Sequence, residues 1–237
     1  MSASSSCLRI APEVFARLPG LRVVTVEARG IGPASPRVEK MWIEAWQSLR
    51  RDFAYPNAQG HPRIAGWRQA MKSLGASAKD FPTSVESLVR RALKSESPFR
   101  INPLVDFYNA ICLRHVVPAG GFDLESLAVE RIALRFTEAG DTFQALGAEA
   151  AEPVPAGEVA YAAGKTILTR QLMWRQSHQG SIGERTRRAL FVSELLPADG
   201  ELAGRLEADL AAGLSELFGA QVIAAVVDEG SLSSPPG

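Results

Sequence analysis

The sequence predicts an α+β fold, because helical patterns fall mainly in the first half of its 237 residues and strand patterns mainly in the second. This segregated order differs from the regular alternation that produces a doubly wound parallel sheet. A composition of 46% hydrophobic and 22% charged residues is ordinary for a globular chain and provides enough apolar side chains for a sizeable core.

The first half is expected to form one strand followed by four helices. Residues 21–27 follow Pro19-Gly20 and are rich in β-branched residues, which is typical of a strand. After a loop at 31–35, apolar residues recur at helical spacing up to about Leu113. The four helix starts are marked by Pro36, by the pair His61-Pro62, by the capping box Thr83-x-x-Glu86 and by the N-cap pair Asn102-Pro103.

In the second half the apolar period changes to two. Residues 131–136 alternate arginines with Ile132, Leu134 and Phe136, as in a half-exposed strand. Further strands are expected at 159–161, 166–174 and 189–192. Leucines at helical spacing then predict a helix over 197–218, and residues 221–227 form a last strand.

The charge balance limits the possible partners. Twenty-six basic and twenty-six acidic residues give no net charge, whereas proteins that bind nucleic acid by neutralising phosphates usually carry a basic excess. We therefore expect no DNA partner, and an RNA partner only through a local patch or a transient contact at one end.

Targeting and metal patterns are also missing from the sequence. The longest apolar run, residues 222–227, is far too short to span a membrane, and residues 1–7 lack the pattern of a signal peptide. Cys7 and Cys112 form no metal-binding spacing with each other or with histidines. A cytoplasmic protein with no membrane contact and no metal is the expectation.

Two segments carry side chains suited to binding. Residues 173–181 gather hydrogen-bonding groups, among them Arg175, Gln176 and His178, where an expected strand enters a loop. Asp106 and Asn109 lie three residues apart on one expected helical face, and an amide can recognise both ends of an amino acid. The alternatives are a polar surface turn for His178 and a structural asparagine that ties its helix to the 118–123 loop.

Other candidates have simpler interpretations. His61 is interpreted as an exposed turn residue, and His115 as a residue that stabilises the end of its helix. The densest basic cluster, Arg185, Arg187 and Arg188, is either a solvated strand edge or a phosphate contact, and hence a candidate tRNA-binding patch.

The two binding segments resemble a known family. The stretch 102–109 (NPLVDFYN), followed by Pro118 and residues 122–124 (FDL), is similar to the "NxVVDVTNY…GQPxHAFDL" motif of the editing domain, called B3/B4, of the phenylalanyl-tRNA synthetase beta subunit. Residues 182–186 resemble the "VTDET" of the same domain. The chain is more similar still to freestanding proteins built from this domain. They share short motifs at residues 67–68, 74–75, 84–86, 90–91, 102–106, 108–109 and 174–176.

The resemblance covers residues 21 to 227 and implies a β-sandwich of unusual topology flanked by helices. We accordingly expect an N-terminal segment of residues 1–20, a single domain of 21–228 and a flexible tail of 229–237. In the synthetase the domain hydrolyses the ester of tyrosine wrongly attached to tRNA, without a metal or organic cofactor. The chain lacks the aminoacylation domain, so the resemblance implies no ligase activity.

The chain departs from the family at substrate-reading positions. The family's histidine falls on Gly120, its threonine on Tyr108, and its loop glutamate near His178. The aspartate and asparagine are kept at Asp106 and Asn109. The scaffold is thus retained, while tyrosine specificity is not implied.

These observations lead to one hypothesis and one rival. The hypothesis is a freestanding deacylase that meets the aminoacylated 3′ end of tRNA transiently and hydrolyses misacylated tRNA in trans. His178 and Gln176 would carry the reaction, and the residues expected to hold the substrate are Asp106, Tyr108, Asn109, Gly120 and Arg175. The rival is a module that binds an amino acid or small metabolite without hydrolysis.

Overall fold

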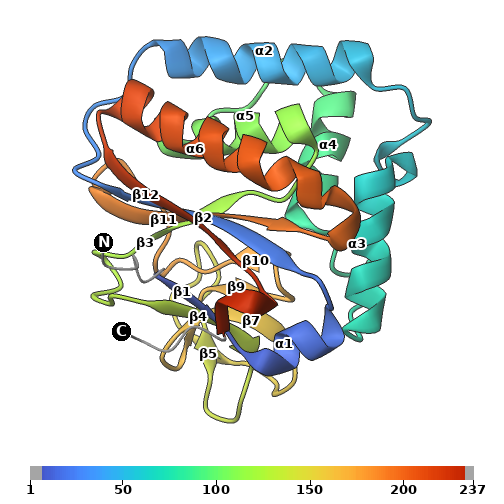
Figure 1. Ribbon diagram of the computed structural model, residues 1–237, viewed down its shortest axis with the longest axis vertical. Coiled ribbons are helices and arrows are strands. Elements are labelled where there is room, and N and C mark those ends of the chain that lie inside the picture. Colours follow the sequence, from blue (N-terminus) through green and yellow to red (C-terminus); the bar gives the residue numbers. More distant parts are fainter. Residues whose placement is uncertain (1–6, 233–237) are drawn as a thin grey trace.

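The computed structural model describes residues 7–232 and contains three stacked layers: helices, a four-stranded sheet and a six-stranded sheet of shorter strands (Figure 1). The predicted fold class, an α+β sandwich of two sheets flanked by helices, is confirmed. The helices are α1 (Pro12–Arg17), α2 (Arg37–Asp52), α3 (Pro62–Ser73), α4 (Ser84–Lys94), α5 (Pro103–His115) and α6 (Ala203–Phe218), and the 3-10 turns are η1 (Ala58–Gly60), η2 (Pro197–Leu202) and η3 (Glu229–Leu232).

The four-stranded sheet is antiparallel throughout and crosses the middle of the molecule. Its strands, in spatial order, are β12 (Gln221–Val227), β2 (Arg22–Arg29), β11 (Arg188–Leu195) and β3 (Gly120–Asp123). Its outer face is covered by α6, with α2 above that helix (Figure 1). The first layer of core lies here, where Val24, Val26 and Ala28 of β2 pack in one cluster with leucines of α6.

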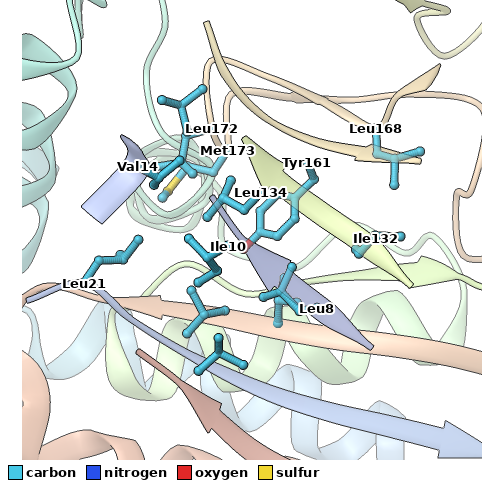
Figure 2. Close-up of a cluster of buried hydrophobic side chains, with 14 of the residues drawn as sticks. Leu8, Ile10, Val14, Leu21, Ile132, Leu134, Tyr161, Leu168, Leu172 and Met173 are labelled. Atoms are coloured by element: carbon cyan, nitrogen blue, oxygen red, sulfur yellow. The ribbon is translucent and has the colours of Figure 1, made fainter. Parts of the chain in front are cut away.

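The six-stranded sheet lies beneath it. Its strands, in spatial order, are β1 (Leu8–Ile10), β4 (Ile132–Phe136), β7 (Val159–Ala163), β8 (Thr166–Ile167), β5 (Thr142–Phe143) and β6 (Glu152–Pro153). A separate ribbon is made by β9 (Thr169–Arg170) and β10 (Arg175–Gln176). Figure 2 shows part of the core between the sheets, where Ile10 and Leu134 surround the ring of Tyr161.

Three of the four predicted helix starts are confirmed by side-chain hydrogen bonds at the first turn, whereas Pro36 precedes α2 without one. Thr83 Oγ1 accepts from Glu86 N–H at 3.3 Å and Asn102 Oδ1 accepts from Val105 N–H at 3.0 Å. His61 is not an exposed turn residue: it is half-buried, and its Nδ1 accepts from Arg63 N–H at the start of α3. Its imidazole has a lowered pKa because of burial and the nearby Arg63 charge.

Two expected elements differ from the structure. Within 166–174 only β8 and β9 are strands, because Gln171 and Leu172 adopt φ of 46° and 61°, which turns the chain toward β10. The helix expected over 197–218 begins as the 3-10 turn η2 and becomes α-helical only at Ala203.

Both ends of the described part of the chain, residues 7–232, contact the sandwich. Residues 8–10, within the expected N-terminal segment, form β1 and pair in parallel with β4, and Phe15 of α1 is buried in the lower core. Of the expected tail, 229–232 form η3, and residues 233–237 lie outside the described part. None of the described helices is long and apolar enough to cross a membrane.

Candidate functional site

A cavity of about 110 Å³ opens between the two sheets, where β3 and β11 face β7 and the β9–β10 ribbon. Its floor is buried and mostly apolar, and its rim is partly exposed, with Arg175 the most open of the lining side chains. Two polar residues on the floor, Tyr161 and Glu194, belong to opposite sheets. Ligand sites commonly combine apolar walls with a few convergent polar groups, so we take this cavity as the candidate site.

Tyr161 and Glu194 join the two sheets through a short hydrogen bond. The Tyr161 hydroxyl donates to Glu194 Oε1 at 2.6 Å, and both side chains are buried. The backbone N–H of Tyr161 donates to Thr169 Oγ1 at 3.1 Å, which ties β7 to the ribbon beside the cavity. Figure 2 shows the Tyr161 ring standing among aliphatic side chains, so water has little access to the pair from that side.

Burial changes the acidity of both groups. It raises the pKa of the Glu194 carboxyl above the ordinary value, although the hydrogen bond from Tyr161 opposes this shift. Burial and the adjacent Glu194 charge raise the pKa of Tyr161 well above its ordinary value. Glu194 is therefore a carboxyl whose proton is held more tightly than usual, and it is the carboxyl that lines this cavity.

The rim is built on the outer edge of β3, the last strand of its sheet. Gln176 Nε2 donates to Gly121 O at 2.8 Å across this edge. In a strand, the N–H and C=O of one residue point to the same side, so the Gly121 N–H also points away from β11. A Cβ built on Gly120 would meet no atom within 4 Å, which means that this position faces open space at the cavity.

Arg175 and Trp174 form the exposed part of the rim. The Arg175 guanidinium carbon lies 4.6 Å from the centroid of the Trp174 ring, which in turn packs edge-on against Phe81 at 4.8 Å. The first turn of α4 closes this side, since Ser84 N–H donates to Met173 O at 3.1 Å. The cavity thus brings together Gly120, Arg175 and Gln176 from the predicted site residues.

The predicted residues of α5 lie outside the cavity lining. Asp106 is buried and accepts from Arg100 Nε at 2.7 Å and from Ile101 N–H, so it fixes the chain before α5. The ring of Tyr108 is buried against Phe191 in the helix-facing core. Asn109 is partly exposed. The side-chain amide that holds the 118–123 loop in the described structure belongs to Gln176 and not to Asn109.

His178 and Arg185 face a different depression. They line an open groove of about 940 Å³ beside Asp123, Glu125 and Glu184. His178 is exposed, and its backbone N–H donates to Gln144 O at 2.8 Å. The structure therefore separates His178 from the residues around Gly120, although both segments were expected to meet at one ester.

The predicted basic cluster is divided by its ion pairs. Arg188 donates to Glu27 and to both oxygens of Glu130, at distances of 2.7 to 3.0 Å. Arg187 donates to the backbone oxygens of Glu184 and Thr186. Arg185 and Arg187 are exposed, whereas the charge of Arg188 is bound to carboxylates.

The two segments that carry the family resemblance are joined by one buried contact. Thr186 Oγ1 donates to Asp123 Oδ2 at 2.6 Å, and Asp123 Oδ1 accepts from Ser126 N–H at 2.8 Å. The Asp123 N–H also donates to Gly180 O at 2.9 Å. These contacts fix the loop that carries His178 against the end of β3.

Tyr161 and Glu194 were missed by reasoning from the sequence. A signal was present, because Glu194 is the only charged residue in the otherwise apolar or small stretch 189–198. A lone acid in a buried strand needs a partner. Within residues 7–232 no group of three or more His, Cys, Asp or Glu side chains is placed to hold a metal ion.

The chain was also compared with known proteins, structures and family profiles. No curated protein matches the sequence. A crystal structure of an N-terminal fragment of the phenylalanyl-tRNA synthetase beta subunit from Pyrococcus horikoshii aligns with a TM-score of 0.49 and 10% identity, over 97% of this chain and 56% of that one. The chain thus spans about half the length of that fragment. The sequence profile of the B3/4 domain matches residues 66–200, a span that contains every residue lining the cavity, and the protein therefore belongs to the B3/4 domain family.

Proposed function

We propose that this protein is a freestanding deacylase that hydrolyses the ester of misacylated aminoacyl-tRNA in trans. The observation that carries the proposal is the cavity, because it joins the Gly120–Phe122 and Trp174–Gln176 segments of the family motifs around one enclosed space. A volume of about 110 Å³ exceeds the roughly 15 Å³ that a cavity needs to hold one water molecule, so a hydrolytic water can be held beside an ester at the rim.

The rim offers donors for the ester carbonyl. The Arg175 guanidinium and the outward Gly121 N–H both belong to residues that line the cavity, and in this proposal they stabilise the negative charge that develops on the carbonyl oxygen as water attacks. Gln176 fixes this edge through its bond to Gly121 O and thereby positions the reacting group. Position 120, which carries no side chain, leaves space for the aminoacyl group.

Glu194 is the proposed proton acceptor. The water oxygen forms a bond with the ester carbon while its proton passes to the carboxylate. The bond between that carbon and the ribose oxygen then breaks, and the ribose oxygen takes the proton back from Glu194. The products are the free amino acid and tRNA with a free 3′ hydroxyl. A carboxylate with a raised pKa is a stronger base than an ordinary one, and the effect of a general base is typically about a hundredfold or more.

The tRNA body would contact the exposed arginines. Arg185 and Arg187 lie on the loop before β11. Within residues 7–232 neither is paired with a carboxylate, so each can bind a phosphate without breaking an ion pair. Arg188 would remain bound to Glu27 and Glu130. The RNA would then lie across the loop before β11, whose residues also line the groove.

The test is a panel of charged tRNAs incubated with the protein, with loss of the ester followed over time. Hydrolysis of at least one misacylated tRNA, lost in Glu194→Gln while the melting temperature is kept, supports the proposal. The rival function is binding of a free amino acid, which the absence of net charge favours. No ester loss on any tRNA, together with amino-acid binding by calorimetry, would establish that rival.

A further inference from the structure

Arg175 differs from the neighbouring arginines in having no carboxylate partner among residues 7–232. Arg170, on the paired strand β9, is held by Glu158 at 2.6 Å, and Arg135 donates to Asp141 at 2.7 Å. Arg175 is instead exposed and lies over the ring of Trp174. Its charge is therefore available for a ligand at the cavity rim.

The stack beneath Arg175 holds its guanidinium in place. Phe81 packs edge-on against Trp174, and Trp174 lies 4.6 Å below the guanidinium carbon of Arg175. A guanidinium over an aromatic ring is attracted by the ring quadrupole, which lowers the freedom of an otherwise flexible side chain. The opposite face of this planar, charged group is turned toward solvent.

We propose that this outer face of Arg175, supported by Trp174, stacks the adenine base at the 3′ end of a tRNA. Nucleobases that leave a helix are commonly held on aromatic rings or on arginine planes. The inference rests on the proposed function and deepens it, because it names the part of the substrate that the rim recognises. The base could also come from a free nucleotide, and the experiment separates these sources.

The position of the stack relative to the cavity fits this ligand. In an aminoacyl-tRNA the ester is attached to the ribose of the terminal adenosine itself. A base stacked on Arg175 leaves that ribose next to Gln176 and the edge of β3, which line the same cavity. The ester on that ribose then lies next to the open space at Gly120.

The tryptophans provide a selective signal. Trp42 and Trp46 are fully buried and Trp67 is 1% exposed, whereas Trp174 is partly exposed. A base placed over Arg175 should therefore quench mainly the fluorescence of Trp174. We expect a CCA trinucleotide to quench wild-type fluorescence in a saturable manner, and Trp174→Phe to remove this quenching.

Affinities come from the anisotropy of a labelled CCA trinucleotide. Arg175→Ala should weaken binding by about tenfold or more, as expected for loss of one stacking partner. Arg175→Lys, which keeps the charge but not the plane, should weaken it nearly as much. Arg90→Lys, at an exposed site on α4, is the matched control and should leave binding unchanged.

Several outcomes would overturn the inference. Absence of quenching, unchanged binding in Arg175→Ala, or full rescue by Arg175→Lys would each do so. Equal affinity for ATP and CCA would assign the site to a free nucleotide and not to an RNA end. A small aminoacyl ester without a nucleobase separates a failure of the stacking inference from a failure of the proposed hydrolysis. Its hydrolysis by wild-type protein that does not bind CCA would count against the stacking alone, and its complete stability in the presence of wild-type protein that binds CCA would count against hydrolysis alone.

Discussion

Replacing Tyr161 with phenylalanine tests the buried contact at the floor of the cavity. The change removes the 2.6 Å hydrogen bond to Glu194 and leaves the aromatic ring in place among its aliphatic neighbours. The Glu194 carboxyl stays buried but loses its donor from the opposite sheet. Since the volume change is small, the free energy of unfolding should report the lost bond.

The size of the effect depends on the charge of Glu194. A hydrogen bond between neutral groups contributes about 1 kcal/mol, whereas one to a charged group contributes about 2–3 kcal/mol. Because burial raises the pKa of Glu194, folding favours the protonated carboxyl, and wild-type stability falls as pH rises through that pKa. The phenol opposes this loss, so the cost of Tyr161→Phe should grow as pH rises.

Thermal unfolding measured across a range of pH checks this. For a chain of this size about 1 kcal/mol lowers the melting temperature by roughly 2–4 °C. We expect a decrease of ~3 °C at the acid end of the range and of ~6–9 °C at the alkaline end. Tyr108→Phe, at a buried ring without a carboxylate bond in the described structure, should show no such pH dependence.

The reasoning would be refuted by a decrease that is the same at every pH. It would also be refuted if Tyr161→Phe kept its pH dependence in a Glu194→Gln background, because the titrating group would then lie elsewhere.

Four further results are expected. Gly120→His should fold, since a Cβ there meets open space, and should change the rate of ester hydrolysis, which deacylation kinetics will measure; an unchanged rate would place the ester elsewhere. His178→Ala should leave that rate within about threefold of wild type, because His178 faces the separate groove, and a loss of about a hundredfold would move the reaction there. Arg187→Glu should weaken tRNA binding and reduce its salt dependence, whereas equal binding at low and high salt would exclude this contact. Burial favours the neutral form of Glu27, but hydrogen bonds from Arg29, Cys7 and Arg188 outweigh it and lower the pKa to about 2. The free energy of unfolding of wild type should therefore fall by about 3 kcal/mol as pH falls from the ordinary pKa toward 2. Acid unfolding of Glu27→Gln should not show this loss.

Much of the fold could be predicted from local patterns. The start signals at Thr83 and Asn102 act within one helical turn, and both form the bonds that the sequence predicts. The strand expected over 221–227 has those bounds because its residues fit a half-buried outer strand. By contrast, β1 has only three residues and is formed by pairing with β4, which is distant in the sequence. No local pattern predicts such a strand.

The site was predicted only in part, for a similar reason. Arg175, Gln176 and Gly120 were found because their segments carry the family motifs, and they meet at one cavity. Asn109 was expected to hold the substrate or, as the alternative, to tie its helix to the 118–123 loop, but spacing along a helix does not tell which neighbour faces an amide. Gln176 reaches that loop from a strand 55 residues further along the chain. Glu194 and Tyr161 meet across two sheets, a relation that depends on the packing of the whole sandwich.

The position of β2 has a consequence for how the chain folds. This strand lies between β11 and β12, and Thr25 Oγ1 donates to Ala225 O across a sequence separation of 200 residues. During synthesis β2 leaves the ribosome long before either partner, so the N–H and C=O groups along both of its edges lack their sheet partners over that interval. Closing such large loops is slow, because their entropy is lost before the pairing contacts form. We therefore expect slow folding and a need for chaperone protection of the early chain, while the local helices α4 and α5 form first.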